Sequence, residues 1–430
     1  MSNVAVIGYG VVGSGVVEVL ETYSESIRRK AGKEVRVRRI LDIRDFPEDP
    51  YRHLVTRDPE DIFSDPSIDI IVETIGGTRI ALDYTKKALS QGRHVVTSNK
   101  ELFARHSPEL LALAREKGVR YMYEASVGGG IPIIRPLMQC LAANDIMAVT
   151  GILNGTTNYI LTQMRQYGKD FKTALKEARE NGYAEADAAN DLDGHDACRK
   201  IAILSSIAYE RYIDYQDILT EGITEVTCRD FTYARIMGHT IKLVASSSRE
   251  ATGNCISARV CPMLVSKKSP LYGVEDVFNA IVVTGNVVGD AMFYGRGAGK
   301  MPTASAIIAD IIDVVRNPGS MVQVWRREDK GCVRDPGKSH FHYYVRMELP
   351  DRKSAARILP DMIPGAEIIR LHERQPEHEL AFTTPLLDES AFKGFLWTYK
   401  EKCNANSCNF LRFLHQDTFQ AAPANNNREG

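Results

Sequence analysis

Residues Val4 to Leu20, VAVIGYGVVGSGVVEVL, decide the fold of the first part of the chain. A short apolar run leads directly into the glycines of GYGVVG, and apolar residues at helical spacing follow. The stretch therefore predicts a strand, a tight turn and a helix. Glycines in such a turn let the backbone approach a pyrophosphate, which then rests on the N-terminus of the helix. The residues expected to line this dinucleotide site are Gly8, Gly10, Val11, Val12 and Gly13.

Strands and helices alternate along the sequence that follows. Strands are predicted over Val35–Ile43, Asp69–Glu73, His94–Thr97 and Arg120–Tyr123, and helices over Ile80–Gln91 and Pro108–Lys117. This alternation is typical of an α/β fold with a doubly wound, Rossmann-type parallel sheet. Ligands of such sheets bind beyond the carboxyl ends of the strands. The residues at those ends that we expect near the cofactor are Thr74, Ile75, Gly76, Ser98 and Lys100.

Asp42 and Arg44 stand at the end of the second predicted strand, where the choice between NAD and NADP is made. An acid there holds the ribose hydroxyls of NAD, whereas an arginine accepts the 2′-phosphate of NADP. Because both residue types are present, the sequence leaves the preference open. Arg44 is either a cofactor-binding residue or a plain surface arginine.

A second informative stretch is Gly182 to Lys200, GYAEADAANDLDGHDACRK, which combines several carboxylates with a terminal lysine. Asp196 and Lys200 are four residues apart, so they share a face of the helix predicted here. A lysine held among acids stays protonated, and its ammonium suits the oxygen of a carbonyl that becomes an alcohol. A solvated acidic loop that caps a helix is the alternative. The apolar run Ile201–Leu204 favours burial, so we expect the cluster to line a cleft.

Two glycine-rich loops flank a second predicted domain. EASVGGGIP, residues 124–132, offers one carboxylate and a run of backbone carbonyls, which are hard oxygen donors suited to a cation. A plain hinge has the same pattern. GRGAGKMPTASA, residues 295–306, opens a helix predicted to return to the first domain, with a cofactor edge or a hinge at its glycines. Between these loops, NGTTNYIL at residues 154–161 predicts a helix N-cap, and later strands predict a second, α+β domain.

The expected organisation has three domains, a linker before the third and a tail after it. Residues 1–130 form the dinucleotide-binding domain, completed by the return helix at 300–316, and residues 131–299 form the substrate-binding and dimerisation domain. Residues 317–339 are a linker with two Pro-Gly steps, and 340–418 follow a βαββαβ order. The last residues, 419–430, are expected to be disordered.

The composition of the chain excludes several classes of protein. The 430 residues carry a net charge of -1, which gives no general attraction to nucleic acid or to an anionic membrane. The 8 cysteines include no CxxC pair, so neither a zinc site nor a disulfide framework is indicated. Neither a signal peptide nor an apolar run long enough to span a membrane is recognisable. We therefore expect a cytoplasmic protein.

Taken together, the motifs resemble those of the homoserine dehydrogenase family. The resemblance covers roughly residues 3 to 316 and includes GYGVVGSG, VVETIGG, HVVTSNK, YEASVGGGIPIIRPL, GILNGTTNYIL, GYAEAD with DLDGHDACRK, and GRGAGKMPTASA. It implies reversible reduction of L-aspartate 4-semialdehyde to L-homoserine with NADPH or NADH, on the route to threonine and methionine. The alternatives are a dehydrogenase of another small amino-acid semialdehyde, or a non-catalytic regulatory protein that binds NADP and an amino acid.

The resemblance also implies residue roles. Lys200 matches the proton-donating lysine, Lys100 matches a second lysine between cofactor and substrate, and Glu185, Asp191 and Asp196 match acids that orient the substrate. Gly182 and Gly299 match backbone positions near the cofactor. The implied sodium ligands are Glu124 and the carbonyls of Val127, Gly129 and Ile131. Ala188 stands where the family usually has proline, which is expected to loosen the loop that carries Asp187 and Asp191.

The C-terminal region resembles the ACT-type regulatory module of many bacterial members of this family. The turn at residues 351–355, DRKSA, lacks the Pro-Gly pair at which such modules usually hold an effector. A threonine-binding role and a structural or dimerising role therefore both stay open. Association into a homodimer or homotetramer is expected, since the second sheet offers a face or an edge for pairing.

Overall fold

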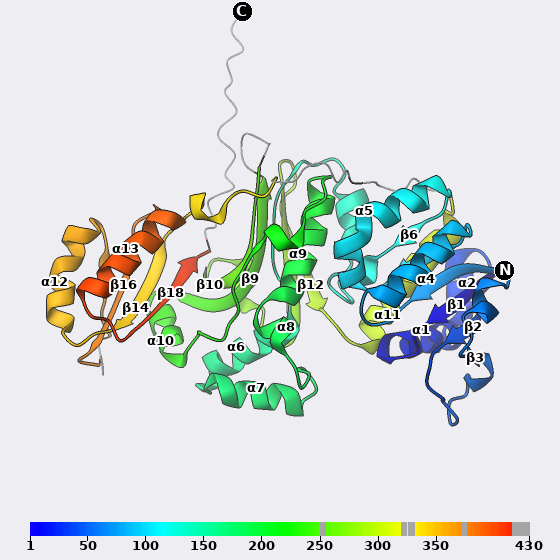
Figure 1. Ribbon diagram of the computed structural model, residues 1–430, viewed down its shortest axis with the longest axis horizontal. Coiled ribbons are helices and arrows are strands. Elements are labelled where there is room, and N and C mark those ends of the chain that lie inside the picture. The colour runs from blue at the N-terminus through cyan, green and yellow to red at the C-terminus, as the bar shows by residue number, and fades with distance from the viewer. Residues whose placement is uncertain (250–254, 320–324, 326–331, 372–375, 415–430) are drawn as a thin grey trace, which may run out of the picture. The chain divides into compact units, whose positions relative to one another are not determined.

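The structure is a computed structural model that describes residues 1–249, 255–319, 325, 332–371 and 376–414 (Figure 1). It divides into two compact units. The first unit comprises Met1–Ala143, Arg199–Asp217 and Phe293–Lys330, and the second comprises Asn144–Cys198, Ile218–Met292 and Gly331–Gly430. Two boundaries fall inside α9 (His195–Ala208) and β12 (Gly289–Arg296), so these elements contribute to both units.

The first unit is built on a parallel sheet in the order β3-β2-β1-β4-β5-β6. Its strands are β1 (Ser2–Ile7), β2 (Val35–Leu41), β3 (Val55–Thr56), β4 (Ile68–Glu73), β5 (His94–Thr97) and β6 (Tyr121–Met122). Its helices are α1 (Val11–Thr22), α2 (Ser24–Ala31), α3 (Glu60–Phe63), α4 (Arg79–Ser90), α5 (Lys100–Glu116) and α11 (Lys300–Arg316). This strand order is that of a doubly wound dinucleotide-binding sheet, so the predicted fold class is confirmed.

The core of this unit forms where apolar faces of α1 and α11 meet the sheet. Val6 of β1, Val16 of α1 and Ile307 of α11 are fully buried in one cluster. The helix after the second glycine-rich loop therefore belongs to the dinucleotide-binding unit, although it lies far along the chain. The chain after residue 133 forms a short π-helix, Pro136–Cys140.

Helix α5 begins eight residues earlier than the sequence predicts, at Lys100 rather than at Pro108. The Asn99 side chain accepts a hydrogen bond from the backbone N–H of Leu102 (3.0 Å) and so caps the helix at the earlier point. Pro108 lies inside the helix and has no N–H to give to the carbonyl of Ala104. The hydroxyl of Tyr212 donates to that carbonyl instead (3.0 Å), which offsets the loss.

The second unit is organised around a mixed sheet in the order β12-β11-β7-β9-β10-β18-β14-β16-β15, with β8 also paired to β10. Its strands are β7 (Ile146–Ile152), β8 (Leu219–Thr220), β9 (His239–Arg249), β10 (Ile256–Ser266), β11 (Phe278–Gly285), β14 (Tyr343–Glu348), β15 (Glu367–Ile369), β16 (Glu379–Thr383) and β18 (Ser407–Phe413). A separate pair joins β13 (His340–Phe341) to β17 (Leu387–Asp388). The helices are α6 (Gly155–Tyr167), α7 (Phe171–Glu180), α8 (Ala189–Leu192), α10 (Cys228–Ile236), α12 (Arg352–Met362) and α13 (Glu389–Lys402).

The strands of the expected ACT-like module continue this second sheet. β18 pairs in parallel with β10, through Met263 opposite Arg412, and β14, β16 and β15 extend the sheet from β18. At the turn without a Pro-Gly pair, the Asp351 side chain caps α12 by accepting from the backbone of Ser354 (3.1 Å). Much of the expected linker (320–324 and 326–331) and the whole tail at 419–430 lie outside the described residues. Within the described residues, no helix has the length and apolarity needed to cross a bilayer.

Candidate active site

The fingerprint loop has the backbone geometry that a pyrophosphate needs. A Cβ on Gly13 would lie 1.9 Å from the carbonyl oxygen of Gly8, so only glycine fits there. The Thr74 hydroxyl donates to the same carbonyl (2.7 Å) and ties the loop after β4 to the fingerprint. No side chain caps α1 within the described part of the chain, and its first turn contains no acid. The backbone N–H groups of Val11 and Val12 can therefore meet an anion.

Arg44 forms a salt bridge with Asp42 at the end of β2. The carboxylate accepts from the backbone N–H of Tyr9 (2.7 Å), from the backbone N–H of Arg44 (3.0 Å), and from Nε (3.0 Å) and Nη2 (2.9 Å) of the guanidinium. The hydrogen bond from Arg44 lowers the pKa of Asp42 to about 2, against the effect of burial. The Arg44 side chain is 57% exposed, and its guanidinium lies over the Phe46 ring.

The ends of β4 and β5 are joined by a buried carboxyl group, that of Glu73. One of its oxygens accepts from the Ile75 backbone (2.8 Å) and the other from the Thr97 hydroxyl (2.6 Å). Burial raises the pKa of Glu73 to about 7. The Asn99 amide donates to the carbonyls of Ile75 and Gly77 at 3.1 and 2.7 Å. The two loops expected to face the cofactor are thus held together by side chains.

Lys100 and Lys200 both belong to the first unit. Lys100 is the first residue of α5, where the helix dipole disfavours a cation, so the helix itself gives no reason for a lysine at this place. Ser98 immediately precedes the Asn99 cap. Lys200 lies near the middle of α9 and is only 8% exposed. A buried lysine is uncommon in a folded protein.

In the second unit, two acids of the acidic segment are brought together by Asn154. Its side-chain amide donates to Oδ1 of Asp191 (2.7 Å) and to Oδ2 of Asp196 (2.9 Å). Its carbonyl oxygen accepts from the Thr157 backbone (2.9 Å), so Asn154 also caps α6, as the sequence predicts. Two carboxylates held at one amide form a site of concentrated negative charge. This arrangement suits the ammonium group of an amino acid.

The remaining acids of the segment are solvent-facing. Glu185, Asp187 and Asp193 are exposed, whereas Asp196 is buried at 5% and Asp191 is half-buried. The alternative of a solvated acidic loop therefore describes one part of the segment and not the other. Ala188, at the usual proline position, is buried at the start of α8.

The two glycines expected near the cofactor lie in different units. Gly182 follows α7 in the second unit with a positive φ of 72°. Gly299 precedes α11 in the first unit. Also in the first unit, the two glycine-rich loops touch, since the Gly130 N–H donates to the Arg296 carbonyl (3.1 Å).

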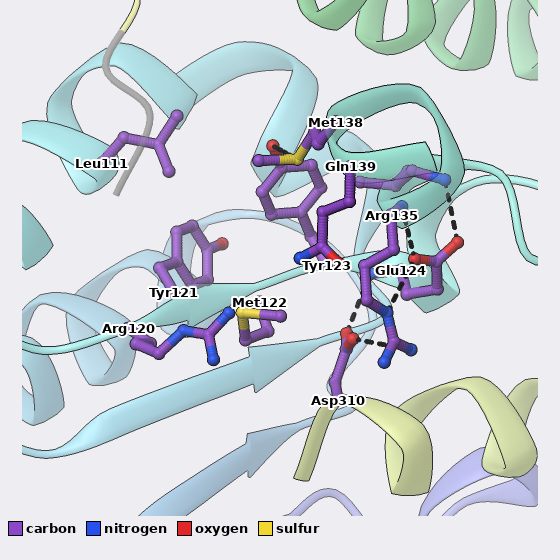
Figure 2. A pocket seen from close by; sticks show the side chains of 11 residues that line it. Leu111, Arg120, Tyr121, Met122, Tyr123, Glu124, Arg135, Met138, Gln139 and Asp310 are labelled. Carbon is purple, nitrogen blue, oxygen red and sulfur yellow. Dashed lines mark hydrogen bonds and ion pairs between the residues drawn. The ribbon is translucent and has the colours of Figure 1, made fainter. Parts of the chain in front are cut away.

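Glu124, the expected sodium ligand, lies in a buried polar network of the first unit (Figure 2). Its carboxylate accepts from the backbone N–H groups of Ile133 (2.7 Å), Ile134 (2.8 Å) and Arg135 (2.9 Å), and from Nε of Arg135 (3.3 Å). Asp310 of α11 accepts from the Glu124 backbone (2.9 Å) and pairs with Nη2 of Arg135 (3.3 Å). Burial raises the pKa of Asp310 to about 7. A cavity of about 50 Å³ adjoins this network.

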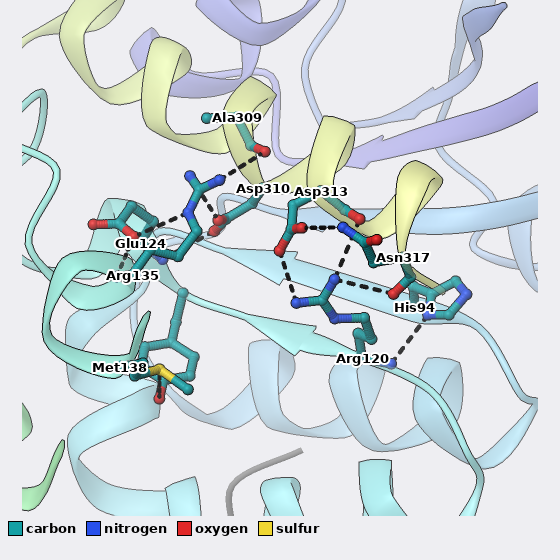
Figure 3. A network of polar contacts seen from close by, with 10 residues as sticks. His94, Arg120, Glu124, Arg135, Met138, Ala309, Asp310, Asp313 and Asn317 are labelled. Atoms are coloured by element: carbon teal, nitrogen blue, oxygen red, sulfur yellow. Dashed lines mark hydrogen bonds and ion pairs between the residues drawn. The ribbon is translucent and has the colours of Figure 1, made fainter. Parts of the chain in front are cut away.

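A second ion pair fixes the same helix to the sheet edge (Figure 3). Arg120 donates to the Asp313 carboxylate (2.8 Å) and to the carbonyls of Asp313 and Asn317 (both 3.2 Å). Both the Glu124 network and this pair thus anchor α11 beside β6. The described residues contain no cluster of three or more His, Cys, Asp or Glu side chains suited to a metal.

Comparison with known proteins identifies the family. The family model described as "Homoserine dehydrogenase" matches residues 132–312, and the "Homoserine dehydrogenase, NAD binding domain" model matches residues 8–124. A curated homoserine dehydrogenase from Synechocystis sp. is 43% identical over 372 residues, which cover 84% of this chain and 84% of that protein. The chain belongs to the homoserine dehydrogenase family. Members are NAD(P)-dependent oxidoreductases that act on a CH–OH group, and this chain is one.

Solved structures of homoserine dehydrogenases agree with this fold. The enzyme from Thiobacillus denitrificans superimposes with a TM-score of 0.86 at 35% identity, covering 96% of this chain and 98% of that one. A hyperthermophilic archaeal homoserine dehydrogenase in complex with NADPH has a TM-score of 0.61 at 30% identity, covering 73% of this chain and 97% of that one. The predicted resemblance and enzyme class are confirmed, and the relatives do not support the non-catalytic alternative.

Sequence reasoning about this homoserine dehydrogenase missed two contributors to the site. It assigned Asn154 a capping role only, although an asparagine cap leaves two N–H donors free for other partners. It also overlooked Glu73, whose position as the last residue of a buried strand was the available signal. The roles of the individual site residues stay predictions.

Proposed function

We propose that this enzyme interconverts L-aspartate 4-semialdehyde and L-homoserine, with Lys200 as the proton donor and Asp191 and Asp196 as the acids that hold the amino group. The observation that carries this proposal is the Asn154 amide shared by the two acids. Asp196 precedes Lys200 by four residues on α9, so one helix face presents both a substrate-holding acid and a lysine.

The chemistry follows from these groups. When bound, NAD(P)H supplies a hydride, which forms the new C–H bond at the aldehyde carbon. The carbonyl π electrons move to oxygen, and the Lys200 ammonium donates a proton there, directly or through a water. Lys100 stabilises the developing negative charge. In the oxidative direction, neutral Lys200 accepts the hydroxyl proton. Glu185, in the exposed part of the acidic segment, is proposed to orient the substrate.

The geometry at Asp42 supports a preference for NADP(H). A carboxylate offers about four lone-pair sites, and the four hydrogen bonds from Tyr9 and Arg44 occupy them. Asp42 is therefore poorly placed to accept a ribose hydroxyl. The exposed guanidinium of Arg44 can still donate to a 2′-phosphate.

A sodium ion at Glu124 is proposed as a structural element only. Glu124 and Asp310 are buried acids that share one guanidinium, so a monovalent cation would balance the negative charge that remains when both acids are ionised. The Glu124 carboxylate already accepts four hydrogen bonds, so an ion would replace the longest, from Nε of Arg135. The test is the melting temperature in sodium chloride against choline chloride at equal ionic strength. Sodium should raise it in the wild type and not in Glu124→Gln, and no difference in the wild type would exclude the ion.

Association as a homodimer through β12 is proposed as well. This strand is at the edge of the second sheet, and it and the preceding turn expose the apolar side chains of Val287 (76%), Met292 (40%) and Tyr294 (54%). Exposed apolar edges favour pairing with another chain. Light scattering should give twice the chain mass for the wild type and the chain mass for Val287→Asp/Tyr294→Asp. A monomeric wild type would refute the proposal.

A cytoplasmic location stays a prediction.

The experiment that tests the reaction is a steady-state assay with aspartate semialdehyde, its nearest semialdehyde analogues and each reduced nicotinamide. The expected result is the highest kcat/KM for aspartate semialdehyde with NADPH. A clear preference for another semialdehyde would overturn the substrate assignment and leave the family assignment in place.

A further inference from the structure

Arg412 of β18 is a buried arginine that bridges two carboxylates of the second unit. It is 1% exposed and donates to Glu221 through Nη1 (2.5 Å) and Nη2 (2.9 Å). It also donates to Glu389 at the start of α13 through Nε (3.1 Å) and Nη2 (2.7 Å). Although burial acts in the opposite sense, the hydrogen bond from Arg412 lowers the pKa of Glu389 to about 2, so Glu389 is ionised. Arg412 and Glu389 of the C-terminal region are therefore joined to Glu221 by two ion pairs that share one buried guanidinium.

The segment that carries Glu221 lies directly against the acidic segment of the site. The backbone N–H of Ile223 donates to the carbonyl of Leu192 (2.9 Å). A Cβ on Gly222 would come within 2.3 Å of that carbonyl and 2.7 Å of the Asp193 Cα, so the two backbones are in contact with no room for a side chain. Leu192 immediately follows Asp191, one of the two acids held by Asn154.

These contacts form one continuous path inside the second unit. It runs from Glu389 and Arg412 to Glu221, through the Gly222 backbone to Leu192, and so to Asp191. Residues 220–223 are also held by β10, because the Glu221 N–H donates to the Val260 carbonyl (2.8 Å). A segment held between a strand and a buried guanidinium has little freedom to shift.

We propose that Arg412 is a positioning residue for the substrate-binding acids, so that the C-terminal region takes part in homoserine binding without contacting the substrate. This rests on the proposed role of Asp191 and Asp196. Glu221, held by Arg412, keeps residues 220–223 pressed against Leu192 and thereby sets the place of Asp191. A purely structural residue would affect the stability of the fold. A positioning residue should also change the KM for homoserine.

Arg259 provides a matched control. It is also a buried arginine of this sheet, and its Nη1 donates to Glu389 (3.0 Å). Among the described residues, the Arg259 side chain forms an ion pair with Glu389 and none with Glu221, so it stabilises the same carboxylate without holding Glu221. A loss of general stability should therefore follow from changing either arginine, whereas displacement of Asp191 should follow only from changing Arg412.

The experiment compares Glu221→Gln, Arg412→Gln, the double variant and Arg259→Gln in full-length enzyme. For each, KM for homoserine, KM for NADP⁺, kcat and melting temperature are measured. We expect Glu221→Gln and Arg412→Gln to raise KM for homoserine by about threefold to thirtyfold, the size of typical coupling effects, with little change in KM for NADP⁺. The double variant should be no worse than Arg412→Gln, and Arg259→Gln should keep the wild-type KM.

Glu221 is 33% exposed, so Glu221→Gln is expected to fold even if Arg412→Gln does not. An unchanged KM for homoserine in folded Glu221→Gln, or an equal rise in Arg259→Gln, would overturn the inference. Failure of the proposed function looks different, because the wild-type enzyme itself would then not oxidise homoserine.

Discussion

The side-chain amide of Asn154 donates a hydrogen bond of 2.9 Å to Oδ2 of Asp196. The second N–H of the same amide is given to Asp191, so a single asparagine sets the separation of two acids that come from different helices, α8 and α9. Neutral donors are needed here, because two carboxylates repel each other when no ammonium lies between them. Asn154 therefore keeps the pair in place while substrate is absent.

Replacing Asn154 with serine should weaken substrate binding and largely spare the fold. Serine keeps an oxygen that can cap α6 but loses both amide donors. A hydrogen bond to a charged group is worth about 1.5–3 kcal/mol, so we expect KM for homoserine to rise by about tenfold or more. The measurement is steady-state kinetics with homoserine, paired with a thermal melt.

Asn286→Ser is the control for that change. The Asn286 amide donates to Asp145 (3.2 Å) in an exposed turn of the same unit. We expect Asn286→Ser to leave the KM for homoserine and the KM for NADP⁺ at their wild-type values. A wild-type KM in Asn154→Ser would show that the two acids do not hold the substrate.

Arg44→Ala should reverse the cofactor preference. It removes the guanidinium expected at the 2′-phosphate and frees Asp42 to accept a ribose hydroxyl, so KM for NADPH should rise by about tenfold to a hundredfold while KM for NADH falls or stays constant. Arg36→Ala, at the opposite end of β2 and paired with Glu34, is the control. Equal losses with both cofactors would rule out phosphate recognition by Arg44.

The Glu73 carboxyl group should make the stability of the first unit depend on pH. Its pKa is raised from an ordinary 4.5 to about 7, so the folded state binds the proton more tightly than the unfolded chain. The stabilisation of the folded state by this tighter proton binding is fully present below pH 4.5 and is lost as pH rises to about 7. Above that pH the ionised group costs about 3 kcal/mol. The difference in unfolding free energy between Glu73→Gln and the wild type should therefore be near zero at low pH and grow in favour of Glu73→Gln up to pH 7. A difference that does not vary with pH would show that Glu73 is not buried as described.

The sequence predicts the order of elements well because the signals involved are local. The glycine fingerprint, the apolar strands and the helical spacing of α11 each depend on a few neighbouring residues, and each has the predicted structure. The start of α5 was wrong because Pro108 is typical of a first helical turn. A distant hydroxyl, that of Tyr212, makes the proline tolerable inside the helix.

Side-chain partners could not be predicted in the same way. Nothing in the spacing indicates that Asn154 reaches Asp191 and Asp196, or that Arg412 reaches Glu221, since these contacts join residues far apart in sequence. Nor does the spacing of the acids in residues 182–200 indicate which of them are buried. The structure separates buried Asp196 from exposed Glu185 because only some of the segment is covered by α6 and by residues 220–223.

The most direct test of the proposed mechanism is the turnover of Lys200→Ala with homoserine and NADP⁺, measured beside the dissociation constant of NADPH for the same preparation. A positioned general acid contributes about a hundredfold to ten-thousandfold in rate, so kcat should fall by at least about a hundredfold while NADPH binding is retained. Arg199→Ala, which removes the adjacent cation of α9, should keep most of the activity. Wild-type turnover in Lys200→Ala would contradict the assignment of Lys200 as the proton donor.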